Sequence, residues 1–120
     1  AGKKIIGVTV LTSMGEQDLM ATGVKAGVAD QVVTLAELAK QAGLDGVVAS
    51  AQEAGILRQK CGDGFLLVTP GIRPAGSEKN DQVRVLTPAQ ALRAGSSYLV
   101  VGRPITKASN PRQALESLWD

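Results

Sequence analysis

The sequence contains no histidine and a single cysteine, Cys61, among its 120 residues. Without histidine, no Ser-His or Cys-His catalytic pair can form within these residues, and zinc sites built from cysteine and histidine are excluded as well. Acid–base chemistry would therefore fall to Asp, Glu, Lys or Tyr. One cysteine cannot form an internal disulfide, which fits a reducing compartment and predicts a cytoplasmic protein. We interpret Cys61 as a small packing residue.

Aromatic residues and excess charge are also scarce. The chain has one Phe, one Tyr and one Trp, too few for a base-stacking surface, and its net charge of +2 does not favour nucleic acid as a partner. No apolar run reaches the roughly 18 residues of a membrane span, and no secretory signal pattern is present. The chain begins at Ala1 and not at Met, which indicates a processed chain or a fragment.

Four apolar runs rich in β-branched residues stand out against this background. They cover residues 5–11, 46–49, 65–68 and 98–101. Each run is nearly continuous, a pattern typical of parallel strands that are covered on both faces.

Segments of helical period lie between and after these runs. They cover residues 28–42, 51–60, 87–95 and 110–115, and residues 12–27 fit a loop with a short helix over 16–21. Thr87-Pro88 and Asn110-Pro111 each read as an N-cap followed by proline at the first helical position. Ser50-Ala51-Gln52-Glu53 resembles a capping box.

The alternation of strand and helix predicts a parallel α/β sheet with right-handed crossovers. Four βα units fit either a small open sheet or half of a (β/α)₈ barrel. An open doubly wound sheet would carry a glycine-rich phosphate turn after its first strand, but residues 11–15 read LTSMG. Glycines and arginines instead follow the last two strands, where barrels build phosphate sites. We predict strands five to eight of a (β/α)₈ TIM barrel, forming one half-barrel domain over residues 1–120.

Residues just beyond the carboxyl ends of parallel strands line the functional site of such folds. Here they are Thr12 and Ser13, then Ser50, Ala51 and Gln52, then Pro70, Gly71, Ile72 and Arg73, and finally Gly102, Arg103 and Pro104. The set offers hydroxyls, an amide, two guanidinium groups and backbone N–H groups at glycines, but no carboxylate and no lysine. It predicts a site that binds an anion and lacks a proton donor.

Arg103 is the strongest candidate within this set. It follows Gly102 at the end of a buried strand, and a guanidinium fork there suits a phosphate group; the alternative is an ion pair with an Asp at the rim. Arg73 can equally be a solvated residue of a proline-flanked turn. Thr12 and Ser13 can instead cap the next helix, and Gln82 alone reads as a surface residue.

Several strings resemble the bacterial branch of the orotidine 5'-monophosphate decarboxylase family. Residues 69–74 read TPGIRP, with Gly76 and Asp81-Gln82 following, and residues 101–106 read VGRPIT. The strings VTVLTSM at 8–14, and GLDGVV at 43–48 with SAQE at 50–53, agree with that family in order and spacing. The resemblance spans essentially all 120 residues.

The resemblance implies a ribulose-phosphate-binding type of barrel that works as a homodimer without a cofactor. It would convert orotidine 5'-monophosphate to uridine 5'-monophosphate and CO₂, the last step of pyrimidine synthesis. Arg103 and the Gly102 backbone would hold the 5'-phosphate. Gln82 would reach the phosphate and the pyrimidine from a flexible lid over about 73–84, with Pro70 and Arg73 at its base. Thr12 and Ser13 would bond the pyrimidine amide edge.

One departure from the family limits what these residues can do. The family's catalytic string D-x-K-x-x-D does not occur, because no Asp of the chain has Lys two positions on. A complete barrel also needs about 250 residues. We therefore expect the C-terminal half of the enzyme, which pairs with an N-terminal half or with another copy of itself. A third alternative, a keto-gulonate-phosphate decarboxylase, is disfavoured by the TPGIRP loop.

Overall fold

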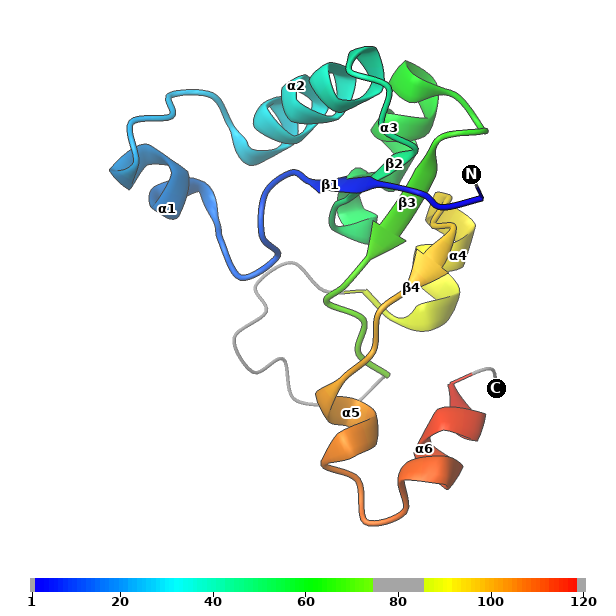
Figure 1. The fold of residues 1–120 in the computed structure, drawn as a ribbon. Coiled ribbons are helices and arrows are strands. Elements are labelled where there is room, and N and C mark those ends of the chain that lie inside the picture. Colours follow the sequence, from blue (N-terminus) through cyan, green and yellow to red (C-terminus); the bar gives the residue numbers. More distant parts are fainter. Residues whose placement is uncertain (1, 75–85, 119–120) are drawn as a thin grey trace.

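The structure, a computed structural model, describes residues 2–74 and 86–118. Within these ranges four strands form one parallel sheet in the order β1-β2-β3-β4 (Figure 1). They are β1 (Ile6–Val8), β2 (Gly46–Val48), β3 (Leu66–Thr69) and β4 (Tyr98–Leu99). All four lie inside or overlap the predicted apolar runs, and the predicted parallel pairing is confirmed.

Helices connect and follow the strands. They are α1 (Glu16–Ala21), α2 (Val28–Gln41), the 3-10 turn η1 (Ala51–Glu53), α3 (Ala54–Cys61), α4 (Pro88–Ala94), α5 (Arg103–Thr106) and α6 (Pro111–Ser117). The short helix expected over 16–21 is confirmed to the residue. The helix expected over 51–60 begins as a 3-10 turn, and α5 was not predicted.

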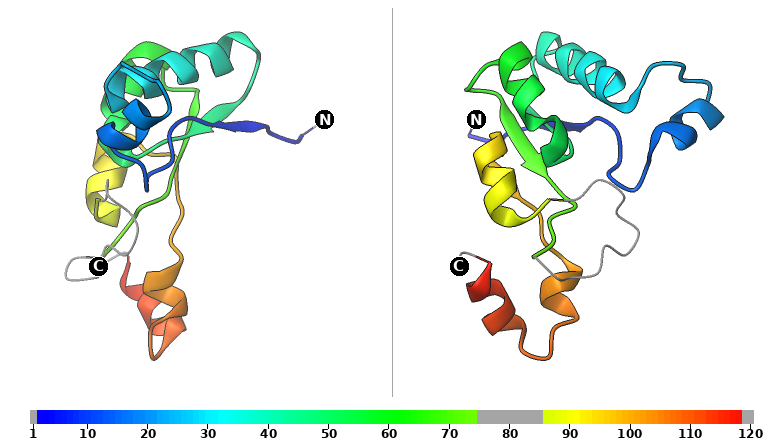
Figure 2. Two further views of the ribbon diagram at one scale, coloured as in Figure 1. Left: turned by 90° about the vertical axis from the view of Figure 1, so that its left-hand side faces the viewer. Right: turned by 180° about the vertical axis from the view of Figure 1, so that it is seen from behind.

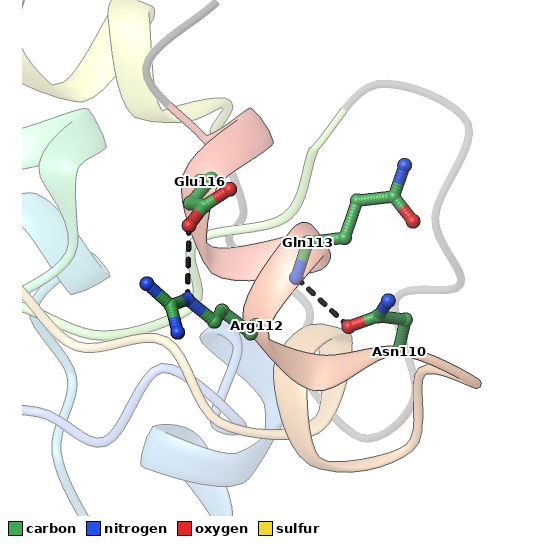
Figure 3. Close-up of polar contacts among 4 residues, drawn as sticks. All are labelled: Asn110, Arg112, Gln113 and Glu116. Atoms are coloured by element: carbon green, nitrogen blue, oxygen red, sulfur yellow. Dashed lines mark hydrogen bonds and ion pairs between the residues drawn. The ribbon is translucent and has the colours of Figure 1, made fainter.

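The predicted helix caps are present. Thr87 forms a capping box, because its hydroxyl accepts from the Gln90 N–H at 3.3 Å while the Gln90 side chain accepts from the Thr87 N–H at 2.9 Å. Asn110 Oδ1 accepts from the Gln113 N–H at 3.1 Å (Figure 3). Ser50 is the N-cap of η1, as predicted, and accepts from the Gln52 N–H at 3.2 Å; the reciprocal bond of a capping box with Glu53 stays a prediction.

The main core lies between the sheet and the helices on one side of it. Val32 and Ala36 of α2, Leu57 of α3, and Val47 and Leu67 of the sheet are at most 1% exposed. Figure 2 shows α2, α3 and α4 on the same side of the strands. Burial of these apolar side chains away from water supplies most of the favourable free energy of folding.

The opposite face of the sheet is open within the described residues. Continuous apolar runs predicted cover on both faces, yet Val8 and Tyr98 are each 59% exposed and Val100 is 48% exposed. The physical reason is that the helices pack against only one face. The apolar side chains on the other face have no covering layer among the described residues. No helix of those residues is long and apolar enough to cross a membrane.

Cys61, at the end of α3, is buried as expected of a packing residue. Burial raises the pKa of its thiol, and the positive charge of Lys40 offsets part of that rise. The Lys40 ammonium donates to the Cys61 carbonyl at 2.6 Å.

The raised pKa of Cys61 predicts a loss of stability at alkaline pH. The folded state holds the thiol proton more tightly than the unfolded state, so this contribution is complete below about pH 8.5 and declines as the pH rises through the folded pKa. Urea unfolding at pH 7.5 and at pH 9.5 should show a larger decline for the natural chain than for Cys61→Ala. Equal declines would contradict the prediction.

Candidate phosphate and nucleotide site

The site is built where β3 and β4 end side by side. The Val100 N–H donates to the Thr69 carbonyl at 2.9 Å, which joins the two strand ends. Thr69 is fully buried, and its hydroxyl hydrogen-bonds Ser96 Oγ at 3.0 Å. The TPGIRP segment and the VGRPIT segment therefore leave the sheet from neighbouring, fixed positions.

The base of the TPGIRP loop is closed by backbone hydrogen bonds. The Arg73 N–H donates to the Leu86 carbonyl at 3.0 Å, and the Leu86 N–H donates to the Gly71 carbonyl at 3.4 Å. Gly71 has a φ of +74°, a conformation that glycine adopts without strain. These bonds hold both ends of the loop at the end of β3. Gln82 and most of the predicted lid over about 73–84 lie outside the described residues.

Arg73 lies within this closed base. Its side chain is only 7% exposed, and its Nη1 donates to the Ile72 carbonyl at 2.9 Å. The alternative of a solvated turn residue is therefore wrong. Pro70, half-buried, begins the loop. The Arg73 guanidinium is buried at the base of this loop, so its positive charge is held in one place.

Gly102 and Arg103 follow β4, at the start of α5. Gly102 is exposed, and its backbone has a φ of −113° and a ψ of −91°. A Cβ at this position would meet no atom of the described residues within 4 Å. The space beside the Gly102 backbone is therefore open to an approaching ligand. Arg103 is half-buried beside it.

A small apolar cluster holds the loops together. Its buried members are Ala51, Ile72 and Ala91, and Leu86, Leu99 and Val101 pack against them. These residues come from the segments after β2 and β3, from α4, and from β4 and its end. The cluster brings Arg73 and Gly102-Arg103 onto neighbouring loops at the carboxyl edge of the sheet.

Thr12 and Ser13 lie further along the edge of the sheet from the loops that carry Arg73 and Arg103. They follow β1, which β2 separates from β3 in the strand order. Thr12 is buried and Ser13 is exposed. The alternative that they cap the next helix is wrong, because the N-cap of α1 is Gly15, whose N–H donates to the Asp18 carboxylate at 2.7 Å.

Leu86 was missed by the sequence reasoning, although it closes the base of the loop. A signal for it exists. Leu86 precedes the N-cap Thr87 and packs in one cluster with Ala91, which is the arrangement of a hydrophobic staple. An apolar residue just before a predicted N-cap therefore marks where the polar loop ends.

The residues predicted at the strand ends carry guanidinium, hydroxyl and amide groups, a set suited to an anion. The carboxylate of Glu53, at the end of η1 beside Gln52, is buried next to them. Within residues 2–74 and 86–118 no cluster of three or more His, Cys, Asp or Glu offers a metal site.

Comparison with known proteins agrees with this geometry. The model of the orotidine 5'-phosphate decarboxylase / HUMPS family matches residues 1–118. The chain belongs to this family. The predicted resemblance and the predicted half-barrel fold class are thereby confirmed, with four parallel strands in alternating βα units.

Individual relatives show how much of the family's length is present. An orotidine 5'-phosphate decarboxylase of Vibrio cholerae is 60% identical over 114 residues, which are 95% of this chain and 49% of the relative. One of Haemophilus influenzae is 58% identical over 95% of this chain and 50% of its own length. The crystal structure of the Lactobacillus acidophilus protein of that name has a TM-score of 0.80 and 42% identity, over 99% of this chain and 49% of its own. The chain thus spans about half the length of these relatives.

Proposed function

We propose that this chain is the nucleotide-binding half of an orotidine 5'-monophosphate decarboxylase. The observation that supports it best is the closed base of the TPGIRP loop beside Gly102-Arg103, at the carboxyl ends of β3 and β4. The complete enzyme would be a carbon–carbon lyase that needs no cofactor and releases CO₂ to give uridine 5'-monophosphate in pyrimidine synthesis. We also propose a cytoplasmic homodimer, in keeping with the single free cysteine.

In this proposal each strand end has a distinct role. Arg103 and the Gly102 N–H bind the 5'-phosphate, since a guanidinium fork and an accessible backbone donor match its oxygens. Arg73 and Pro70 form the base of the lid, and Gln82 reaches from it to the phosphate and the pyrimidine. Thr12 and Ser13 hydrogen-bond the pyrimidine amide edge.

Binding and chemistry are then divided between two halves. Loss of CO₂ leaves a carbanion-like centre, which a positioned ammonium stabilises and then protonates. The proposed site residues of this chain include no lysine and no carboxylate. Phosphate contacts remote from the reacting carbon supply binding energy for loop closure and orientation. The N-terminal half would supply the Asp and Lys residues of the reaction.

Complementation tests this division directly. The chain is mixed with the separately produced part of the Vibrio cholerae relative that it does not cover, and the loss of orotidine 5'-monophosphate absorbance is followed. We expect no turnover from either part alone and measurable turnover from the mixture. Parts that co-sediment as a complex yet leave the absorbance unchanged would contradict the proposal.

A further inference from the structure

β4 is the shortest strand of the described residues, yet the Gly102-Arg103 segment takes its place from it. The two residues of β4, Tyr98 and Leu99, pair in parallel with the end of β3. A slip of β4 by one residue would move the segment that follows by about 3.3 Å and turn its side chains to the other face. The Gly102-Arg103 segment is therefore placed only as well as the register of β4 is defined.

The Ser97 hydroxyl, one residue before β4, bonds directly to β3. Its oxygen accepts from the Leu67 N–H at 3.0 Å and from Arg58 Nη2 at 2.8 Å. The Ser97 N–H donates in turn to the Leu67 carbonyl at 2.9 Å. Ser97 thus engages both backbone groups of one residue of β3, and a slip of β4 by one residue would break both bonds.

A second hydroxyl joins the two strands from the β3 side. Thr69 is fully buried, and its Oγ1 lies 3.0 Å from Ser96 Oγ and 3.3 Å from the Tyr98 carbonyl oxygen. The Val100 N–H donates to the Thr69 carbonyl at 2.9 Å, two residues before Gly102. Side-chain hydroxyls therefore reinforce a strand pairing that has few backbone bonds of its own.

We propose that Ser97 is a positioning residue: its hydroxyl sets the register of β4 and thereby places the Gly102-Arg103 segment beside the base of the TPGIRP loop. Ser97 precedes β4 and the segment follows it, so the hydroxyl acts through the strand and not on the ligand. That the segment binds phosphate rests on the proposed function, whereas the register role does not. If some molecules lose the register, the apparent dissociation constant rises by the inverse of the fraction that keeps it.

Phosphate titration of two Ser97 variants tests the role. Ser97→Ala removes the acceptor, and we expect the dissociation constant for inorganic phosphate to rise at least about fivefold. Ser97→Asp is the rescue, because both partners of the hydroxyl are donors and a carboxylate accepts from both. Its affinity should return to within about twofold of that of the natural chain.

Lys40→Met is the control for a general loss of stability. It removes the donor to the Cys61 carbonyl, between α2 and α3 and away from β4. The variant leaves a part-buried acceptor without its donor, as Ser97→Ala leaves donors without their acceptor. Lys40→Met should nevertheless change the dissociation constant for inorganic phosphate less than about twofold.

Amide hydrogen exchange measures the register without any ligand. The Val100 N–H joins β3 from the β4 side, and the Ala49 N–H joins it from the β2 side at 3.1 Å. In Ser97→Ala the Val100 N–H should exchange faster relative to the Ala49 N–H, because only the pairing of β4 is loosened. Lys40→Met should leave the ratio of the two exchange rates unchanged.

Three results would overturn the inference: an unchanged exchange ratio in Ser97→Ala, equal weakening of phosphate binding by Ser97→Ala and Lys40→Met, or a Ser97→Asp variant that binds as weakly as Ser97→Ala. Faster relative exchange of the Val100 N–H in a chain that binds no phosphate would support the register role and reject the proposed phosphate site.

Discussion

Replacing Arg103 with alanine should weaken binding of inorganic phosphate and of uridine 5'-monophosphate by about tenfold to a hundredfold. The reason is the loss of charge-assisted hydrogen bonds, worth about 1.5–3 kcal/mol in a site of this kind. Arg103 is half-buried at the start of α5 and contributes nothing to the main core. The fold should therefore survive the change. Titrations followed by amide chemical shifts would measure both affinities on the natural chain and on the variant.

Glycine substitutions provide a matched control for the backbone part of the same site. A Cβ at Gly102 or at Gly55 would meet no atom of the described residues within 4 Å, and neither residue has a positive φ. Gly102→Ala should therefore leave the unfolding midpoint nearly unchanged, whereas Gly55→Ala, inside α3, should raise it, because alanine favours the helix by up to about 1 kcal/mol over glycine. Only Gly102→Ala should weaken phosphate binding, because only there would the new methyl group stand between the ligand and the backbone N–H.

Thr12→Ala should distinguish binding of the pyrimidine from binding of the phosphate. Thr12 follows β1, at the opposite edge of the sheet from Arg103, which follows β4. Loss of the Thr12 hydroxyl should therefore lower the affinity for uridine 5'-monophosphate and leave the affinity for inorganic phosphate unchanged.

An Arg103→Ala variant that titrates inorganic phosphate like the natural chain would refute the assignment of Arg103.

Local signals in the sequence predicted the elements and their ends well. The caps at Thr87 and Asn110 depend on side chains that bond within three residues, and that information is contained in the sequence itself. The parallel order followed from the alternation of apolar runs and helical periods. The placing of Gly102-Arg103 beside the TPGIRP loop also followed, because successive parallel strands end at one edge.

Features set by distant contacts were not predictable in the same way. The sequence favoured a solvated turn residue and a phosphate ligand equally for Arg73. Its burial depends on Leu86, which pairs with Ile72 from the far end of the loop. The open face depends on which layers pack on the sheet. A continuous apolar strand looks the same in the sequence whether its second covering layer belongs to this chain or to a partner.

Arg58 is the clearest such case. In the sequence it is one polar residue of the predicted helix over 51–60. In the structure its Nε donates to the Gly95 carbonyl at 3.0 Å and its Nη2 to Ser97 Oγ at 2.8 Å. Its Nη1 contacts three further carbonyl oxygens, those of Gly62, Asp63 and Phe65. One guanidinium thus joins the end of α3, the end of α4 and the entries of β3 and β4.

Arg58→Met should therefore destabilise the chain by at least about 3 kcal/mol. Methionine keeps much of the apolar stem but leaves several partly buried acceptors without a donor, each at a cost of about 1–3 kcal/mol. Arg112→Met is the control, because the Arg112 side chain is 89% exposed and its ion pair with Glu116, 3.2 Å long, lies on the surface of α6 (Figure 3). Removing such a pair should change stability by about 0.5 kcal/mol or less. Urea unfolding would measure the unfolding free energies of the two variants, provided that the dependence of that free energy on urea concentration is unchanged.

Arg58→Lys distinguishes charge from geometry at this position. An ammonium keeps the charge but has three donors on one atom, so it cannot span acceptors on both Gly95 and Phe65 as the planar guanidinium does. We expect the lysine variant to lose most of the stability that the methionine variant loses. Full stability in Arg58→Lys would mean that charge alone matters here, and stability losses of similar size in Arg58→Met and Arg112→Met would contradict the joining role.

Because β4 is positioned through Ser97, a loosened Arg58 contact should also weaken phosphate binding at Arg103, at the other end of that strand.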